Sequence, residues 1–136
     1  MVGGEKNIVK AAEKIRLGVR ALMTSDSSMG VLRPASDVLK NPSGVCRDYA
    51  ILFTALARAA GIPARPVGGL TLSRGSFYYH AWAEVWTGRE WMAVDATLPA
   101  STADAGHIKL TQGDATRMYA IAKVAGQLKA EILEFR

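Results

Sequence analysis

The pattern of the sequence changes at residues 61–63, Gly-Ile-Pro, and this change divides the chain into two parts. Before it, apolar residues recur at helical spacing; after it, strand-like runs alternate with turns that contain glycine. The sequence therefore predicts a helical part over about residues 6–60 and a sheet part over about residues 63–136. Because 49% of the 136 residues are hydrophobic, the chain can bury one core, and we expect a single domain over residues 1–136.

The last helix of the first part begins at Cys46, the one cysteine of the chain. It follows the turn-forming residues 41–44, Asn-Pro-Ser-Gly, and precedes a run rich in Ala and Leu that ends at Gly61. In the first turn of a helix, unpaired backbone N–H groups and the helix dipole favour a thiolate over a thiol. Cys46 is therefore a candidate nucleophile, with a small buried residue as the alternative. A single cysteine excludes an intramolecular disulfide.

Two strand-like runs, at residues 78–86 and 90–96, predict a hairpin. A two-residue loop after Trp86 would place His80 directly opposite Asp95, on the same face of the sheet, whereas a three-residue loop would shift the partner by one residue. A carboxylate beside an imidazole selects its tautomer and stabilises its protonated form, which in turn can hold a thiolate. A cross-strand ion pair on the surface is the alternative interpretation.

Trp82 lies two residues after His80 and therefore shares its face of the strand. We expect it to screen the pair from water or to line a substrate-binding groove, with packing in the core as the alternative. His107 has no matching carboxylate motif, and we expect it in a loop, in a structural or exposed role.

The other expected elements follow from the same patterns. Apolar residues at helical spacing predict an amphipathic helix over residues 8–22, whose basic face is solvated. Residues 64–72 are expected to form a strand that is either at an edge or beginning near Pro66. The remaining expected elements are a short strand at residues 108–110, a helix at 114–124 and a final strand at 128–135.

Charge and hydropathy exclude several classes of function. The net charge of +5 is spread over single residues, without a Lys/Arg block, so a nucleic-acid partner is not expected. No apolar run reaches the roughly 18 residues that a membrane helix needs, and no signal peptide is recognisable. A cytoplasmic location is the default expectation, unless the chain is a fragment of a longer protein. The pattern predicts no particular oligomeric state.

Three segments together resemble the transglutaminase-like superfamily, in the order expected of its members. They are GVC, which leads into a helix ending AAGIPAR (residues 44–65), HAWAEV (residues 80–85) and WMAVDAT (residues 91–97). HIKL at residues 107–110 also resembles bacterial members. The resemblance covers about residues 35–110 and implies a papain-like α+β fold, the transglutaminase core, with the nucleophile helix packed on an antiparallel β-sheet.

The resemblance assigns a role to three residues. It implies that Cys46 is the nucleophile, His80 the general base and acid, and Asp95 the orienting carboxylate. Members often place a Gln or Trp side chain in the oxyanion hole, but neither residue type occurs before Cys46. The backbone N–H of Cys46 is therefore the expected first oxyanion donor, and the second donor is unassigned.

The implied function is that of a cysteine-dependent hydrolase or acyl transferase. It acts on an amide bond of a peptide or protein substrate through a thioester, which water or an amine then resolves. A catalytically silent protein-binding module is the alternative, although a binding role needs none of the three residues. A zinc site of Cys46, His80 and Asp95 is disfavoured, because one thiolate and no short-spaced ligand pair are present. No cofactor or metal is expected.

Overall fold

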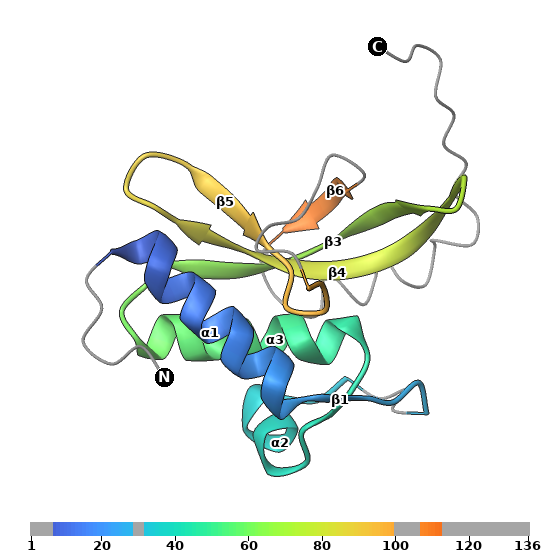
Figure 1. The fold of residues 1–136 in the computed structure, drawn as a ribbon, viewed down its shortest axis with the longest axis horizontal. Helices are drawn as coiled ribbons and strands as arrows, with labels where there is room; N and C mark the ends of the chain where they lie inside the picture. Colours follow the sequence, from blue (N-terminus) through green and yellow to red (C-terminus); the bar gives the residue numbers. More distant parts are fainter. Residues whose placement is uncertain (1–6, 29–31, 100–106, 113–136) are drawn as a thin grey trace.

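The computed structural model describes residues 7–28, 32–99 and 107–112. The helix and strand expected at residues 114–124 and 128–135 lie outside these ranges. In chain order the described elements are α1 (Ile8–Leu22), β1 (Thr24–Ser25), α2 (Ala35–Lys40), β2 (Ser43–Gly44), α3 (Cys46–Ala59), β3 (Ala64–Ser73), β4 (Ser76–Trp86), β5 (Trp91–Val94) and β6 (His107–Gln112). The fold is α+β, and Figure 1 shows the helices gathered on one side of the sheet.

The main sheet has the order β5-β4-β3-β6, and all of its pairings are antiparallel. Strand β3 is therefore internal. Pro66 lies near its beginning, before the residues from Val67 to Thr71 that pair with β6. The missing N–H of Pro66 thus falls outside that ladder, which shows that the proline marks a strand beginning.

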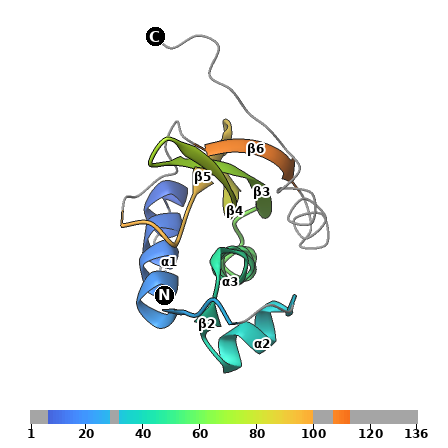
Figure 2. The same cartoon turned by 90° about the vertical axis from the view of Figure 1, so that its right-hand side faces the viewer.

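Helix α3 is the centre of the packing. Figure 2 shows it between the sheet and α2, with α1 beside it. Its Leu52 and Phe53 are fully buried and share a core with Ile15 of α1 and Val85 of β4. The small residues of α3 allow this close approach. The nucleophile helix expected from the sequence therefore packs on an antiparallel sheet.

The basic face of α1 differs from the expectation. Arg16 is 1% exposed, and its Nη1 donates a hydrogen bond of 2.7 Å to the carbonyl oxygen of Leu98. Arg20 donates through Nη1 to the carbonyl oxygen of Thr97, also at 2.7 Å. The prediction of a solvated basic face is thus wrong for Arg16, because tertiary packing buries it beside a backbone acceptor, whereas Arg20 is exposed as expected. Both tie α1 to the turn that follows β5.

None of the helices in the described ranges is both long and apolar enough to cross a bilayer.

Candidate active site

Cys46 is the first residue of α3, and Val45 alone separates it from β2, which pairs in parallel with β1. The helix beginning is held by Asp48, whose Oδ2 accepts a 3.0 Å hydrogen bond from the N–H of Val45. Asp48 is fully buried, and Arg33 Nη2 lies 3.6 Å from its other oxygen. A Cβ at Gly44 would overlap Asp48 Oδ2. The glycine before Val45 and Cys46 is thus required by the carboxylate that caps α3.

His80 lies on β4, and Asp95 follows the last residue of β5. The predicted two-residue hairpin loop is wrong, because Trp86 pairs with Trp91 and residues 87–90 form the loop. His80 and Asp95 are therefore not directly opposed. The register differs from the prediction by two residues, which keeps both residues on one face of the sheet. His80 Nε2 lies 2.6 Å from Asp95 Oδ2, so the predicted pair is formed across a diagonal.

The Asp95 carboxylate is buried and held by its own turn. It is 1% exposed, and its Oδ1 accepts hydrogen bonds from the N–H and the hydroxyl of Thr97, at 2.9 and 2.6 Å. The N–H of Leu98 donates to the Asp95 carbonyl oxygen at 3.3 Å and closes the turn. Arg16 and Arg20 hold the outer carbonyl groups of this turn, so α1 contributes to the position of the carboxylate.

The two groups stabilise each other's charged forms. Burial acts to lower the pKa of His80, but its hydrogen bonds with Asp95 and Cys46 and their charges outweigh this effect and raise the pKa to about 10. Burial acts to raise the pKa of Asp95, but the hydrogen bond and charge of His80 and the bonds from Thr97 lower it to about 2. At neutral pH the pair is therefore an imidazolium and a carboxylate.

Cys46 and His80 face a common cavity. Its volume is about 540 Å³, and it is lined by Arg20, Ser25, Ser27, Val45, Cys46, Tyr49, His80 and Thr97. Because His80 Nε2 faces Asp95, its Nδ1 is the nitrogen left for Cys46. On its other side Cys46 packs with Tyr79 against Ile51 and Ala81. Burial, followed by the charge of Cys46, raises the pKa of Tyr79 to about 12.

Ser25 and Ser27 are cavity residues that the sequence pattern did not single out. Ser25 pairs with Gly44 in the parallel β1–β2 ladder, and the N–H of Asp26 donates to the Gly44 carbonyl oxygen at 2.9 Å. The segment therefore lies beside the residues that precede Cys46. No motif marks it, because the contact depends on a two-residue parallel pairing between distant parts of the chain.

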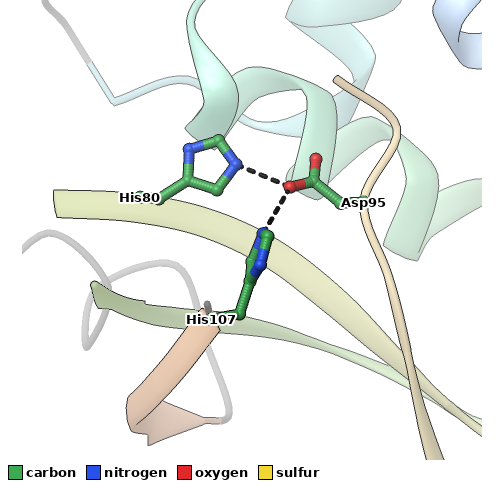
Figure 3. Close-up of side chains that lie close together, drawn as sticks. All are labelled: His80, Asp95 and His107. Carbon is green, nitrogen blue, oxygen red and sulfur yellow. Dashed lines mark hydrogen bonds and ion pairs between the residues drawn. The ribbon is translucent and has the colours of Figure 1, made fainter. Parts of the chain in front are cut away.

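His107 also belongs to the site, and its position differs from the prediction. The structure puts it at the start of β6, where its Nε2 lies 3.1 Å from Asp95 Oδ2 (Figure 3). The prediction of a loop residue without a carboxylate partner is therefore wrong. The resemblance of HIKL at residues 107–110 to bacterial members was the one sequence signal that pointed to His107. Its partner Asp95 follows β5, a separate strand, so residue spacing could not predict the contact.

Trp82 is buried, with 3% of its surface exposed, and its ring lies beside the rings of His80 and His107. The ring centroids of Trp82 and His80 are 6.1 Å apart with nearly parallel planes, and those of Trp82 and His107 are 4.9 Å apart at 88°. This placement favours screening of the imidazoles from water. A substrate-binding role for Trp82 stays a prediction, and the tryptophan does not line the cavity beside Cys46.

Within the described ranges, one group of side chains has the composition of a metal site: His80, Asp95 and His107, whose ligand atoms lie within 4.8 Å of one another. It differs from the set considered from the sequence, because His107 takes the place of Cys46. Zinc ligands at about 2.0–2.1 Å in a tetrahedron are roughly 3.3 Å apart. The 2.6 Å between His80 Nε2 and Asp95 Oδ2 is too short for that and is a hydrogen-bond distance.

The sequence also matches a known family profile. Residues 1–96 match the profile of the Transglutaminase-like superfamily. The chain belongs to this superfamily. No curated protein matches the chain.

Solved structures of superfamily members have the same fold. A candidate cysteine protease from Cytophaga hutchinsonii is 29% identical, with a TM-score of 0.73 over 82% of this chain and 38% of that chain. Calcium-bound LapG from Legionella pneumophila is 15% identical, with a TM-score of 0.62 over 79% of this chain and 71% of that one. Red sea bream transglutaminase is 17% identical, with a TM-score of 0.51 over 75% and 23%. The chain thus spans 38% of the length of the Cytophaga protein.

The shifted pKa values predict how the stability of the fold depends on pH. The raised pKa of His80 contributes stability that is complete below about pH 6.5 and is lost as pH rises through about 10. The lowered pKa of Asp95 contributes stability that is complete above about pH 3.8 and is lost as pH falls through about 2. The pair therefore stabilises the fold most between about pH 3.8 and 6.5.

This expectation is checked with urea unfolding of the parent chain and of His80→Gln at pH 5.5, 7.5 and 9.5. Glutamine does not titrate, so the difference in the free energy of unfolding should shrink steadily from pH 5.5 to 9.5. A difference that stays constant over this range would contradict the raised pKa of His80.

Proposed function

We propose that this chain is a cysteine-dependent hydrolase that cleaves an amide or peptide bond through a thioester. Cys46 is the nucleophile, His80 the general acid and base, and Asp95 the orienting carboxylate. One observation carries the proposal: Cys46, at the beginning of α3, and His80, hydrogen-bonded to buried Asp95, line the same cavity. The superfamily and the Cytophaga cysteine-protease likeness support the same reaction class.

In the first half-reaction, the thiolate of Cys46 attacks the carbonyl carbon of the substrate and a C–S bond forms. The tetrahedral intermediate carries its negative charge on the former carbonyl oxygen. His80 gives its proton to the departing nitrogen, the C–N bond breaks, and an amine leaves. The products of this step are a thioester on Cys46 and a neutral imidazole on His80.

In the second half-reaction, neutral His80 takes a proton from a water molecule, whose oxygen attacks the thioester carbon. The C–S bond then breaks, which releases a carboxylic acid and restores the thiolate and the imidazolium. An amine in place of water would make the same chain an acyl transferase. Water is the acceptor in this proposal, because the cavity at Cys46 is open and Ser25, Ser27 and Thr97 of its lining can hydrogen-bond a water molecule.

The intermediate needs hydrogen-bond donors for its oxyanion. The backbone N–H of Cys46, in the first turn of α3, is the first donor in this proposal. Ser25 or Ser27 is the second, because both line the cavity on the segment that pairs beside Gly44. A serine hydroxyl from this segment would take the place of the Gln or Trp side chain expected of the family.

The test is the rate at which iodoacetamide alkylates Cys46 between pH 4 and 9, in the parent chain and in His80→Ala. The single cysteine makes the mass shift unambiguous. Because the raised pKa keeps His80 protonated, we expect alkylation of the parent to stay fast well below pH 8.5, where free thiols lose their reactivity. In His80→Ala the rate at pH 6 should fall by about 10- to 100-fold.

Tyr78→Ala is the matched control, because Tyr78 is exposed and lies on the same strand two residues before His80. It should leave the alkylation profile unchanged. A parent chain whose Cys46 reacts only near pH 8.5, with no effect of His80→Ala, would favour the catalytically silent binding module.

A further inference from the structure

Four hydrogen bonds converge on the Asp95 carboxylate, two on each oxygen. Oδ1 accepts from the N–H and the hydroxyl of Thr97. Oδ2 faces His80 Nε2 at 2.6 Å and His107 Nε2 at 3.1 Å. An ionised carboxylate only accepts hydrogen bonds, so both Nε2 atoms must carry protons. His107 is thus a donor to the oxygen that His80 uses.

The fold holds the His107 imidazole in this position. Its side chain is 6% exposed, and its backbone belongs to β6, where it pairs with Thr71 of β3. The ring stands at 88° to the Trp82 ring, with centroids 4.9 Å apart, and edge-on to the His80 ring at 5.6 Å. Figure 3 shows the two histidines, from different strands, pointing toward one oxygen of Asp95.

Gly69 makes this arrangement possible. It lies on β3 between His80 of β4 and Lys109 of β6, at a register irregularity. A Cβ there would overlap the carbonyl oxygen of Ile108 and lie 2.8 Å from Trp82 Cη2. The absence of a side chain therefore lets β6 and the Trp82 ring approach closely, which carries His107 toward Asp95.

We propose that His107 is a positioning residue of the Cys46–His80–Asp95 site, which restrains Asp95 so that it orients His80. This inference rests on the proposed function. His107 does not line the cavity beside Cys46, so it acts through Asp95 and not on the substrate. With Thr97 holding one carboxylate oxygen and His107 the other, the carboxyl group cannot rotate away from the imidazole of His80.

The titratable and charged groups around Asp95 come from three other elements. His80 and His107 face it from β4 and β6, and Arg16 of α1 contributes a longer-range positive charge. Among the residues that the structure describes, removal of the His107 donor leaves His80 as the one hydrogen-bond partner of Oδ2. The ionised form of Asp95 is then less stabilised. As pH is lowered, the alkylation rate of Cys46 should therefore begin to fall at a higher pH than in the parent chain.

The test compares His107→Phe, which keeps a ring against Trp82 without a donor, with His107→Gln, whose amide N–H can reach the same oxygen. The readout is the iodoacetamide rate of Cys46 from pH 3 to 7. We expect His107→Phe to move the acid-side fall of the rate up by about one to two pH units, the effect of one charge-assisted hydrogen bond, with a smaller loss at pH 6 than in His80→Ala. His107→Gln should restore most of the loss, and Leu110→Ala, exposed on the same strand, should change nothing.

A second arm asks whether His107 acts through Asp95. In an Asp95→Ala background, His107→Phe should cause no further loss, because no carboxylate is left to position. An equal loss in both backgrounds, or a His107→Gln as impaired as His107→Phe, would overturn the positioning role and leave a packing role. Loss of parent reactivity after dialysis against EDTA, with recovery on adding Zn²⁺, would overturn it in favour of a metal site.

The two variants distinguish a failure of the His107 proposal from a failure of the proposed function. If His80→Ala abolishes the low-pH reactivity while His107→Phe leaves it intact, the positioning role fails and the Cys46–His80 pair stands. If neither variant changes the reactivity of Cys46, both proposals fail.

Discussion

Replacing Cys46 with alanine is expected to lower kcat for amide hydrolysis by about 10⁴-fold or more, because no other group in the proposed mechanism can form the thioester. The free energy of unfolding should change little, since Cys46 is only partly buried beside the open cavity. The measurement is the release of new amino groups from a tryptic digest of casein, detected with fluorescamine. With hydroxylamine present, the parent chain should also form hydroxamates from its thioester.

Lys40→Ala is the control for this comparison, because Lys40 is exposed at the end of α2. It should hydrolyse the digest at the parent rate. Turnover by Cys46→Ala at a rate near that of the parent would remove Cys46 from the mechanism. A parent chain that forms hydroxamates but releases no new carboxyl groups in water would identify an acyl transferase.

Replacing Asp95 with asparagine is expected to lower kcat by about 10³- to 10⁴-fold. Both oxygens of Asp95 are acceptors, one for Thr97 and the other for His80 and His107. The asparagine side chain offers one acceptor oxygen and one NH₂ donor. In either orientation its NH₂ group faces donors, either those of Thr97 or those of the two histidines. His80 then loses the carboxylate that selects its tautomer and stabilises its charge, and the variant should also be less stable by about 3–5 kcal/mol.

This expectation is measured as kcat on the casein digest together with the midpoint of urea unfolding. Asp37→Asn is the matched control, because it makes the same chemical change at an exposed carboxylate in the first turn of α2. Activity in Asp95→Asn within a factor of ten of the parent would show that Asp95 does not orient His80.

The sequence pattern predicted those features that depend on residues close together in the chain. Helical spacing gave the bounds of α1, and the turn before Cys46 placed that residue at the beginning of α3. Strand alternation predicted that His80 and the carboxylate of Asp95 lie on the same face of the sheet. This prediction is correct although the predicted register was wrong by two residues. A shift of two residues leaves each side chain on the same face of the sheet, because side chains alternate along a strand with a period of two.

The errors have two causes. The loop after Trp86 is a local turn whose length the turn residues did not specify, whereas the burial of Arg16 and the partner of His107 depend on contacts between separate segments of the chain. Ser25 likewise enters the cavity through a two-residue parallel pairing with Gly44. Such contacts leave no periodic pattern in the local sequence.

Local spacing therefore specified the helix that begins at Cys46 and the strand that carries His80, and the resemblance to the superfamily supplied the candidate roles of both residues. Tertiary packing specified how these elements meet: the diagonal distance to Asp95, the second histidine on its oxygen and the cavity in front of Cys46. Backbone conformation and side-chain face follow from neighbouring residues, whereas distances between strands and helices follow from the close packing of the whole core.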